Sequence, residues 1–259
     1  MKVTSKDGTP IAVFRSGVGP PLILSTGSLS DHRRWAPVLP YLENHLTVYT
    51  YDRRGRGESG DNDPYSIERE FEDIAAIADH INEPVSLLGH SYGGIVALGA
   101  ALQISNLDKL ILYEPPIHAR TDISHSGIAD RIQALIDVDD REGAVMKFYV
   151  EVQKRAPEEL ERFRKSPLWD MFLSAAHTLP REMRNVEGYQ FNGQYFHNFE
   201  TPTLLLLGSK SSTSFQKAIN TLHNALPNSR IDIMPDQGHA AMDTGTELFA
   251  SEILKFLST

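Results

Sequence analysis

Short runs of apolar residues alternate along this chain with longer stretches in which apolar residues recur every three or four positions. Short apolar runs are typical of buried strands, and the longer spacing is typical of helices that bury one face. Because the two kinds of segment alternate, we expect an α/β fold in which helices cover both faces of a mostly parallel sheet. The predicted strands are residues 11–15, 21–25, 46–51, 85–88, 109–113, 203–207 and 231–234.

Two helical segments are especially clear in this pattern. Residues 67–81 form an amphipathic segment, and Ser66 stands where its hydroxyl can cap the first turn. The chain closes on a second helix whose inward-facing residues are predicted to be Phe249, Ile253, Phe256 and Leu257. Both helices are long enough to pack against the predicted sheet.

The stretch from residue 115 to residue 200 breaks the alternation. It holds about 85 residues between two predicted strands, where ordinary connections have about two to six. Helical spacing recurs within it, at residues 128–136 and 145–152. We therefore predict a core domain, residues 1–114 and 201–259, and a helical lid, residues 115–200, that excludes water from a substrate pocket. A second structural layer without a gating role is the alternative.

A Gly-x-Ser-x-Gly motif lies at residues 89–93, between a β-prone run and a helix-forming one. In a nucleophile elbow the serine stands in a strained turn between strand and helix, so the residues two positions away must be small. Gly89 and Gly93 meet that need. The turn holds the hydroxyl beside the N-terminus of the following helix, whose free N–H groups favour developing negative charge. Ser91 is therefore the candidate nucleophile.

Composition and charge exclude several other classes of protein. The 259 residues are 41% hydrophobic, which suits one large core with an inserted subdomain. The net charge of −9 disfavours a nucleic-acid partner, and the absence of cysteine excludes disulfides and thiolate metal sites. The longest apolar run, residues 93–102, is too short to span a membrane, and the N-terminus lacks a secretory signal. We expect a cytoplasmic protein; no pattern indicates an oligomeric state.

Two further motifs point to a known family. Residues 51–59, Tyr-Asp-Arg-Arg-Gly-Arg-Gly-Glu-Ser, are similar to the Asp-x-Arg-Gly-x-Gly-x-Ser segment that follows the fourth strand of α/β-hydrolases, and Gly238-His239 follows the last predicted strand. Together with the serine motif they stand in the expected order, so the chain resembles the α/β-hydrolase superfamily across nearly its whole length. The resemblance implies an eight-stranded, mostly parallel sheet with the lid between strands six and seven.

The resemblance also points to a general base. These enzymes order their triad as serine, acid and histidine, and His239 lies in the loop where the family places its base. His90, inside the serine motif, is expected to point away from the reacting atom and to act in packing or specificity. Three histidines in or beside the lid could line a pocket: His118, His177 and His197. No histidine spacing resembles a metal motif, so we expect no metal site.

The acid departs from the usual family pattern. Relatives commonly carry an aspartate just past the seventh strand, yet residues 207–213 contain no carboxylate. Some relatives place the acid at the end of the sixth strand instead, and Glu114 stands there. It could accept a hydrogen bond from Nδ1 of His239 and fix its tautomer. A dyad without an acid is one alternative, and Asp236 or Asp243, which flank the histidine, are another, although both lie close to it along the chain.

Attack on a carbonyl also requires two donors for the resulting oxyanion. The backbone N–H of Tyr92, immediately after the nucleophile, is the first candidate. Relatives supply the second from a His-Gly-x-x loop after the third strand, where this chain has Ser-Thr-Gly-Ser-Leu with Thr26 in place of the histidine. Backbone donors do not depend on side-chain identity, so the N–H of Ser28 can serve. Alternatively, Gly27 only makes a turn.

The predicted function is a serine hydrolase that needs no cofactor. It would cleave a small carboxylic ester, lactone or thioester through an acyl-enzyme on Ser91, with His239 as base. Aromatic lid residues suggest an apolar acyl or aryl group on a small-molecule substrate, although they could equally form the lid's own core: Phe148, Tyr149, Trp169, Phe172 and Phe196. Perhydrolases, carbon–carbon bond hydrolases, lyases and ligand receptors share this fold and stay open as alternatives.

Overall fold

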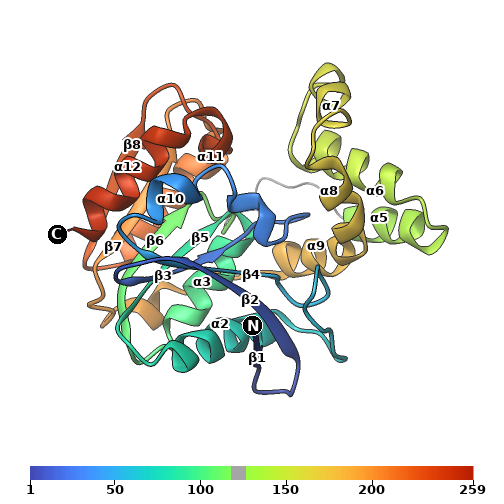
Figure 1. Cartoon of the computed structure of the whole chain (residues 1–259). Coiled ribbons are helices and arrows are strands. Elements are labelled where there is room, and N and C mark those ends of the chain that lie inside the picture. The colour runs from blue at the N-terminus through green and yellow to red at the C-terminus, as the bar shows by residue number, and fades with distance from the viewer. Residues whose placement is uncertain (118–126, 259) are drawn as a thin grey trace.

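A computed structural model describes residues 1–117 and 127–258 of the chain (Figure 1). Eight strands form one sheet in the order β1-β2-β4-β3-β5-β6-β7-β8. The pairs β1–β2 and β2–β4 are antiparallel, and the remaining pairs are parallel. The predicted eight-stranded, mostly parallel sheet is therefore confirmed. The strands are β1 (Lys2–Thr4), β2 (Pro10–Gly17), β3 (Pro21–Ser25), β4 (Thr47–Tyr51), β5 (Val85–His90), β6 (Leu107–Tyr113), β7 (Thr203–Gly208) and β8 (Ser229–Met234).

The central strands explain why the sequence pattern located them. Every residue of β3, β5 and β7 is buried, so β3 and β7 are nearly continuous apolar runs, and β5 buries Ser86 and His90 among its apolar residues. The short edge strand β1 buries only its middle residue. It was missed because three residues are too few to show a period.

Helices cover both faces of the sheet. In β6, Leu110 and Leu112 belong to one apolar cluster and Ile111 belongs to the other, because successive side chains of a strand point to opposite faces. The first cluster includes residues of α2 (Ile67–Ile81), α3 (Tyr92–Ala101) and α10 (Thr213–Ala225). The second includes residues of η1 (His32–Trp35), α1 (Leu39–Leu42), α11 (Ala241–Thr244) and α12 (Thr246–Leu257).

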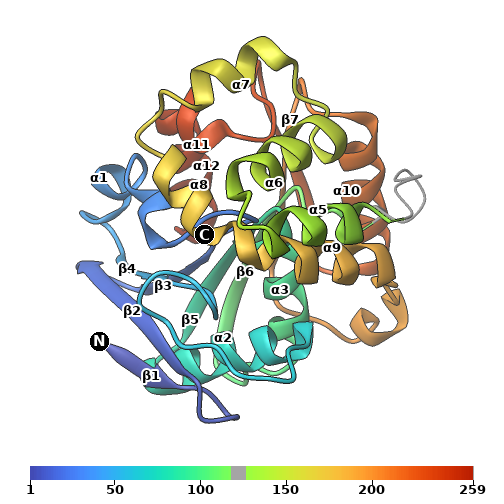
Figure 2. The same ribbon diagram turned by 90° about the vertical axis from the view of Figure 1, so that its right-hand side faces the viewer.

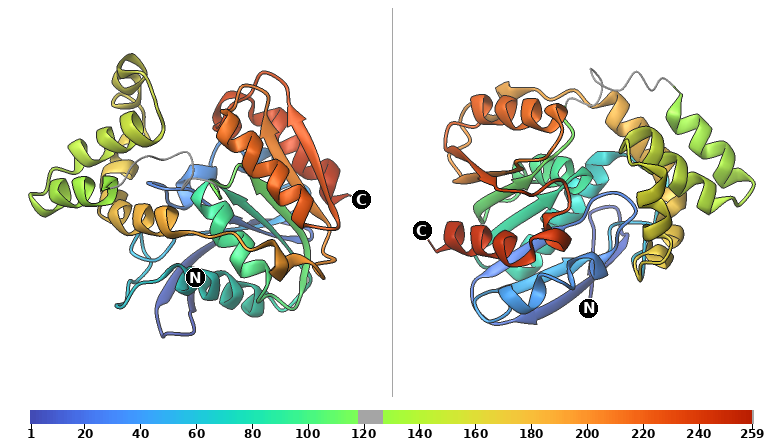
Figure 3. Two further views of the ribbon diagram at one scale, coloured as in Figure 1. Left: turned by 180° about the vertical axis from the view of Figure 1, so that it is seen from behind. Right: turned by 90° about the horizontal axis from the view of Figure 1, so that it is seen from above.

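A mostly helical segment separates β6 from β7, and we call its described residues 127–200 the cap. Figure 1 shows its helices α5 to α8 to one side of the sheet-and-helix core, and Figure 2 looks onto these helices from that side. The views from behind and above again show them to one side of the core (Figure 3). Its elements are α5 (Ile128–Asp137), α6 (Arg141–Lys147), η2 (Phe148–Val152), α7 (Pro157–Phe163), α8 (Trp169–Ala175), η3 (Ala176–Thr178), α9 (Leu179–Gly188) and η4 (Gly193–Phe196). The boundary of a separate lid domain at residues 115–200 stays a prediction.

Two local predictions need correction. Ser66 precedes α2 as expected, but its side chain makes no capping hydrogen bond. The helix expected over residues 145–152 is instead α6 followed by the π-helical turn η2. A π-helical turn is rare and is frequent at functional sites. The irregular turn lies in the part of the cap that reaches the candidate nucleophile.

Candidate active site

The candidate nucleophile stands in a strained turn between β5 and α3. Ser91 has φ of 56°, in the left-handed region that a residue with a Cβ rarely adopts. Its N–H donates to the carbonyl of Tyr113 on β6 at 2.9 Å, and its own carbonyl accepts from Gly94 at 2.8 Å. A Cβ on Gly89 would lie 2.5 Å from Cβ of Ala97, so the close approach of strand and helix requires glycine there.

His239 and Glu114 form a direct hydrogen bond. Nδ1 of His239 lies 2.7 Å from Oε2 of Glu114, whose side chain is fully buried. The other carboxylate oxygen, Oε1, accepts from the N–H of Gly208 at 2.8 Å and from the hydroxyl of Ser211. Phe215 stacks on the imidazole with ring centroids 4.3 Å apart. The histidine is thus held on its edge by a carboxylate and on its face by an aromatic ring.

Neither flanking aspartate takes this place. Asp243 binds both terminal nitrogens of Arg34 at 2.6 Å. Asp236 is exposed and pairs with Lys210 at 3.0 Å. Glu114 is therefore the carboxylate that the structure brings to the imidazole.

One small cavity brings the predicted groups together. Its volume is about 70 Å³, and both Ser91 and His239 line it. Nε2 of His239 is buried and has no hydrogen-bond partner among the described residues, so it is not bonded to the Ser91 hydroxyl in this state. Catalytic hydrogen bonds are often long in structures without substrate and tighten when substrate is bound. The free nitrogen leaves His239 able to accept a proton.

The two candidate oxyanion donors lie beside the nucleophile. Ser28 lines the same cavity, and a Cβ on Gly27 would lie only 2.9 Å from Cβ of Ser91. Tyr92 opens α3 immediately after the serine. In the described part of the chain, neither N–H donates to another backbone or side-chain group. Both donors are therefore free to bind a ligand oxygen.

These observations agree with a comparison of the chain against known families. A sequence model described as the alpha/beta hydrolase family matches residues 22–252. The chain belongs to the alpha/beta hydrolase family. The predicted family, its fold and an enzyme of the hydrolase class are thereby confirmed.

Individual relatives show how wide this family is. An alpha/beta hydrolase from Sphaerobacter thermophilus is 34% identical, with a TM-score of 0.84 over 96% of this chain and 100% of that chain. The (E)-2-((N-methylformamido)methylene)succinate hydrolase of Acinetobacter baylyi is 24% identical over 95% of this hydrolase and 93% of its own length. The 3-oxoadipate enol-lactonase 1 of the same organism is 27% identical, but the match spans only 50% of this chain and 54% of that protein.

Aromatic side chains of the cap line part of the candidate cavity of this hydrolase. Of the five aromatic residues singled out from the sequence, Phe148, Tyr149 and Phe172 line the cavity. Trp169 instead packs edge-on against Phe172, and Phe196 lies in a stack with Phe191. Sequence reasoning missed four further cap residues that line the cavity: Gln153, Arg155, Phe163 and Leu168. The only local signal for them was their nearness to the aromatic residues at 148 and 149.

The other histidines divide between cavity, surface and the part of the chain that is not described. His90 lines the cavity beside Ser91, and its Nε2 lies 2.9 Å from the carbonyl oxygen of His239. Burial, reinforced by the neighbouring His239, lowers the pKa of His90 well below its usual range. His177 and His197 are exposed and do not line the cavity. His118 lies outside the described residues.

The Asp-x-Arg-Gly-like segment after β4 supports the loop that carries Ser28. The side chains of Arg53 and Arg56 both donate to the carbonyl of Gly27, at 3.2 and 3.0 Å. Sequence reasoning used this segment only as a family marker. Local sequence could not predict this contact, because residues 53 and 27 come together only when β3 and β4 pair in parallel.

One cluster in the described ranges contains three potential metal ligands, and it has protein partners instead. Asp31, His32 and Asp52 place ligand atoms within 4.8 Å of one another. Asp31 binds the guanidinium of Arg33, and Asp52 accepts from the N–H groups of His32 at 3.0 Å and Glu58 at 2.9 Å. These contacts fix two loops, and we assign no metal to them.

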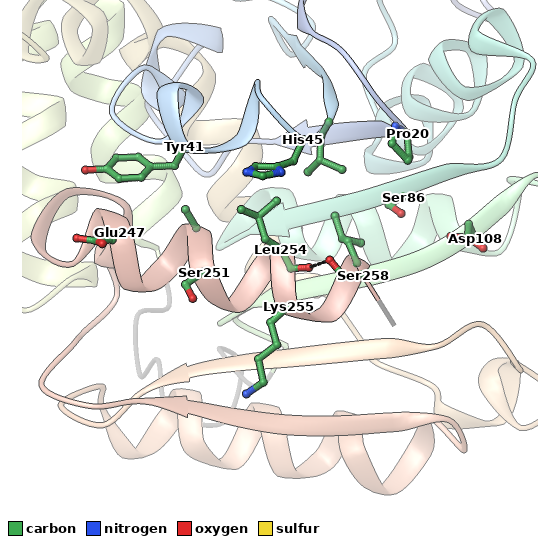
Figure 4. A pocket seen from close by; sticks show the side chains of 13 residues that line it. Pro20, Tyr41, His45, Ser86, Asp108, Glu247, Ser251, Leu254, Lys255 and Ser258 are labelled. Carbon is green, nitrogen blue, oxygen red and sulfur yellow. Dashed lines mark hydrogen bonds between the residues drawn. The ribbon is translucent and has the colours of Figure 1, made fainter.

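A much larger hollow lies at the opposite end of the sheet. Its volume is about 700 Å³, and it is lined in part by Pro20, Ser86 and Asp108 near the amino ends of β3, β5 and β6. Figure 4 shows His45 and Leu254 on opposite walls of this hollow. No candidate catalytic residue lines it.

Among residues 1–117 and 127–258, no helix is long and apolar enough to cross a membrane.

Proposed function

We propose that this hydrolase cleaves small carboxylic esters, lactones or thioesters through an acyl-enzyme on Ser91. The observation that carries the proposal is the 2.7 Å contact between Glu114 and His239, whose second nitrogen is unpartnered in the cavity that also contains Ser91. This arrangement has the parts of a nucleophile, a base and an orienting carboxylate.

The tautomer of His239 determines the first step. A carboxylate on Nδ1 holds the proton there, so Nε2 keeps a lone pair and can take the proton of the Ser91 hydroxyl. As the serine oxygen bonds to the carbonyl carbon, the carbonyl oxygen becomes an anion. The N–H groups of Ser28 and Tyr92 would donate to that anion. Glu114 stabilises the imidazolium that forms.

Collapse of the tetrahedral intermediate breaks the bond to the leaving group. His239 returns its proton to the leaving alcohol or thiol, and the acyl group stays on Ser91. The histidine then removes a proton from water, which attacks the acyl carbon through a second tetrahedral intermediate. Release of the carboxylic acid restores the serine hydroxyl.

The cavity walls support a substrate with an apolar acyl or aryl group and an anionic end. Phe148, Tyr149 and Phe172 supply apolar surface. Arg155 adds a positive charge whose acidic partner, Glu159, is 3.4 Å away and has a half-exposed side chain. Asp243 does not neutralise it, because Asp243 is occupied by Arg34. The names of two relatives, a succinate-derivative hydrolase and a 3-oxoadipate enol-lactonase, also describe carboxylate-bearing molecules.

The size of the cavity adds a condition on turnover. A cavity of about 70 Å³ is smaller than the roughly 300–1,000 Å³ of ordinary small-molecule sites. We therefore expect cap side chains to move outward when a substrate enters. Their return would exclude water around the acyl-enzyme.

The test is rapid-mixing hydrolysis of p-nitrophenyl acetate and butyrate. We expect a burst of one p-nitrophenol per protein followed by slower turnover, as an accumulating acyl-enzyme requires. Ser91→Ala should lose the burst and about 10⁴-fold or more of kcat. Ser251→Ala, on the exposed rim of the hollow at the opposite end of the sheet, is the matched control and should keep both.

Each other outcome contradicts the proposal. Ester cleavage that survives in Ser91→Ala would exclude this serine as nucleophile. Stoichiometric binding of carboxylic esters without turnover, unchanged by Ser91→Ala, would favour a ligand receptor on the same fold.

A further inference from the structure

The carbonyl of Gly27 accepts hydrogen bonds from two buried guanidinium groups. Nη1 of Arg53 lies 3.2 Å from this oxygen and Nη1 of Arg56 lies 3.0 Å from it. The exposed fractions of the two arginines are 1% and 3%. This carbonyl belongs to the same peptide group as the N–H of Ser28, the proposed oxyanion donor.

Both arginines also contact other parts of the oxyanion site. Arg56 donates through the same Nη1 to the carbonyl of Ser30 at 2.8 Å, so it holds the loop at two points. The guanidinium of Arg53 lies over the ring of Tyr92, 4.5 Å from the ring centroid. Arg53 therefore contacts the carbonyl of the Gly27–Ser28 peptide group and the ring of Tyr92, the other residue whose N–H would bind the oxyanion.

Two buried carboxylates pair with the guanidinium groups of Arg53 and Arg56. One carboxylate belongs to the core and the other to the cap. Glu70 on α2 binds Nε and Nη2 of Arg53 at 2.6 and 2.7 Å. Glu182 on α9 lies 3.0 Å from Nη2 of Arg53 and is hydrogen-bonded to Arg56. Arg56 also donates to the hydroxyl of Thr178 in the cap at 3.2 Å. The network thus joins the oxyanion loop to the cap.

Placing two cations on one carbonyl has a chemical consequence. Hydrogen bonds in a chain polarise one another, so donors on the C=O of a peptide group strengthen its N–H as a donor. Charge-assisted hydrogen bonds produce the larger effect. Burial of charged groups is costly unless they are paired, and joining the cap to the core requires neither two arginines nor their convergence on Gly27.

We propose that Arg53 and Arg56 are positioning residues that orient and polarise the Gly27–Ser28 peptide group for oxyanion binding. Glu182 makes their arrangement depend on the seating of the cap, so the donor is strongest when the cap is closed. This inference rests on the proposed function, because it takes Ser28 as an oxyanion donor.

The test compares an oxygen ester with the matching thionoester, p-nitrophenyl butyrate and its C=S analogue. Sulfur accepts hydrogen bonds weakly, so the ratio of their kcat values reports the strength of the oxyanion donors. Arg56→Lys keeps the charge but loses the planar guanidinium, whose Nη1 donates to both carbonyls while its other nitrogens bind Thr178 and Glu182. We expect kcat for the oxygen ester to fall about 10-fold, a lower oxygen-to-sulfur ratio and a KM within about 2-fold.

Arg54→Lys is the matched control. Arg54 is equally buried and pairs with Asp73 and Asp7, and the hydrogen bonds of its side chain go to Asp73, Asp7 and the carbonyl of Arg69 rather than to residues 27–30. The Arg54→Lys variant should lose about as much stability as Arg56→Lys while keeping the wild-type oxygen-to-sulfur ratio. Glu182→Gln should lower the ratio less than Arg56→Lys, because it leaves both arginines in place.

A wild-type ratio in folded Arg56→Lys overturns the inference. If Arg56→Lys does not fold, Arg53→Lys and Glu182→Gln decide it, and wild-type ratios in both overturn it. A change in KM alone would also overturn it, because that result assigns the network to substrate binding. The wild-type burst keeps the two proposals distinguishable. A burst with unchanged ratios rejects only the polarised peptide, whereas the absence of a burst rejects the acyl-enzyme itself.

Discussion

The two hollows at opposite ends of the sheet differ in volume and in the polar groups on their walls. The hollow in Figure 4 has a volume of about 700 Å³, ten times the roughly 70 Å³ of the cavity lined by Ser91 and His239. Yet the small cavity contains two buried imidazole nitrogens without partners, on His90 and His239. Within the described residues, the walls of the large hollow contribute no buried unpartnered side-chain atom. Converging polar groups, rather than volume, mark the candidate site.

Residues with positive φ are also distributed differently around the small cavity and the large hollow. Of the seven described non-glycine residues with positive φ, four follow the carboxyl ends of β3, β5, β6 and β8, namely Leu29, Ser91, Glu114 and Asp236; the others are Asn82, Asp139 and Lys154. No non-glycine residue with positive φ lines the large hollow. Strained residues persist where the surrounding structure fixes them, and they cluster at sites of function. Each prediction below therefore compares a change in the catalytic cavity with a similar change elsewhere.

The largest expected effect comes from removing the negative charge of Glu114. In Glu114→Gln the amide can donate to Nδ1 of His239 and move the proton to Nε2, the wrong tautomer for a base. We expect kcat to fall about 10³- to 10⁴-fold. Glu247→Gln, on the wall of the large hollow, should leave kcat unchanged. Steady-state hydrolysis of p-nitrophenyl butyrate measures both, and near-full activity in Glu114→Gln would indicate a dyad or another acid.

A methyl group at Gly27 should have the next largest effect. Its Cβ would lie 2.9 Å from Cβ of Ser91, so the oxyanion loop would have to move. We expect kcat/KM to fall about 10²-fold, the effect of losing one oxyanion donor. Gly188→Ala is the control, because nothing lies within 4 Å of its added carbon. Equal activity of the two variants would show that the loop position is not critical.

Removing the charge of Arg155 should alter substrate preference by a smaller factor. For Arg155→Met we expect KM to rise about 10-fold for the p-nitrophenyl monoester of succinate, through loss of a charge-assisted hydrogen bond. KM for the neutral butyrate ester should stay constant. Lys255→Met places the same change at the large hollow and should affect neither ester. Equal changes for both esters would exclude an anionic subsite.

The smallest effect concerns stability below neutral pH. Burial and the neighbouring His239 lower the pKa of His90, so the unfolded chain binds a proton that the folded protein does not. The free energy of unfolding should therefore decrease as pH falls below about 6.5, by up to ~1.4 kcal/mol per pH unit. His90→Gln should show a shallower decrease in urea unfolding between pH 7.5 and 5.5, whereas His45→Gln should match the wild type. An unchanged slope in His90→Gln would assign the acid sensitivity to other groups.

Much of the fold and part of the candidate site could be predicted from local sequence. Buried strands such as β7 contain continuous apolar runs, and α2 begins and ends at the predicted residues 67 and 81. Glu114 could be singled out because the loop after β7 has no carboxylate. Its hydrogen bond to His239 is now seen, whereas the catalytic roles stay predictions.

The remaining features depend on contacts that no local pattern encodes. The π-helical turn η2 follows a regular helix without a break in hydrophobic spacing. Arg155 and Phe163 reach the cavity only through the packing of the cap. Arg53 and Arg56 meet Gly27 through the parallel pairing of β3 and β4. Long-range packing therefore determines which side chains surround a nucleophile that the sequence itself reveals.

The hydroxyl of Ser211 helps to hold a carboxylate that comes from the neighbouring strand. It lies on the loop after β7, where relatives commonly carry their acid, and it donates to the carboxylate that Glu114 supplies from β6. The two strands are parallel neighbours, with Tyr113 paired to Leu206, so their ends face the same imidazole. The orientation of the histidine is thus secured by an edge of the sheet rather than by one fixed position. A carboxylate on either of these two strand ends could therefore orient the imidazole of His239 without any change in the position of Ser91.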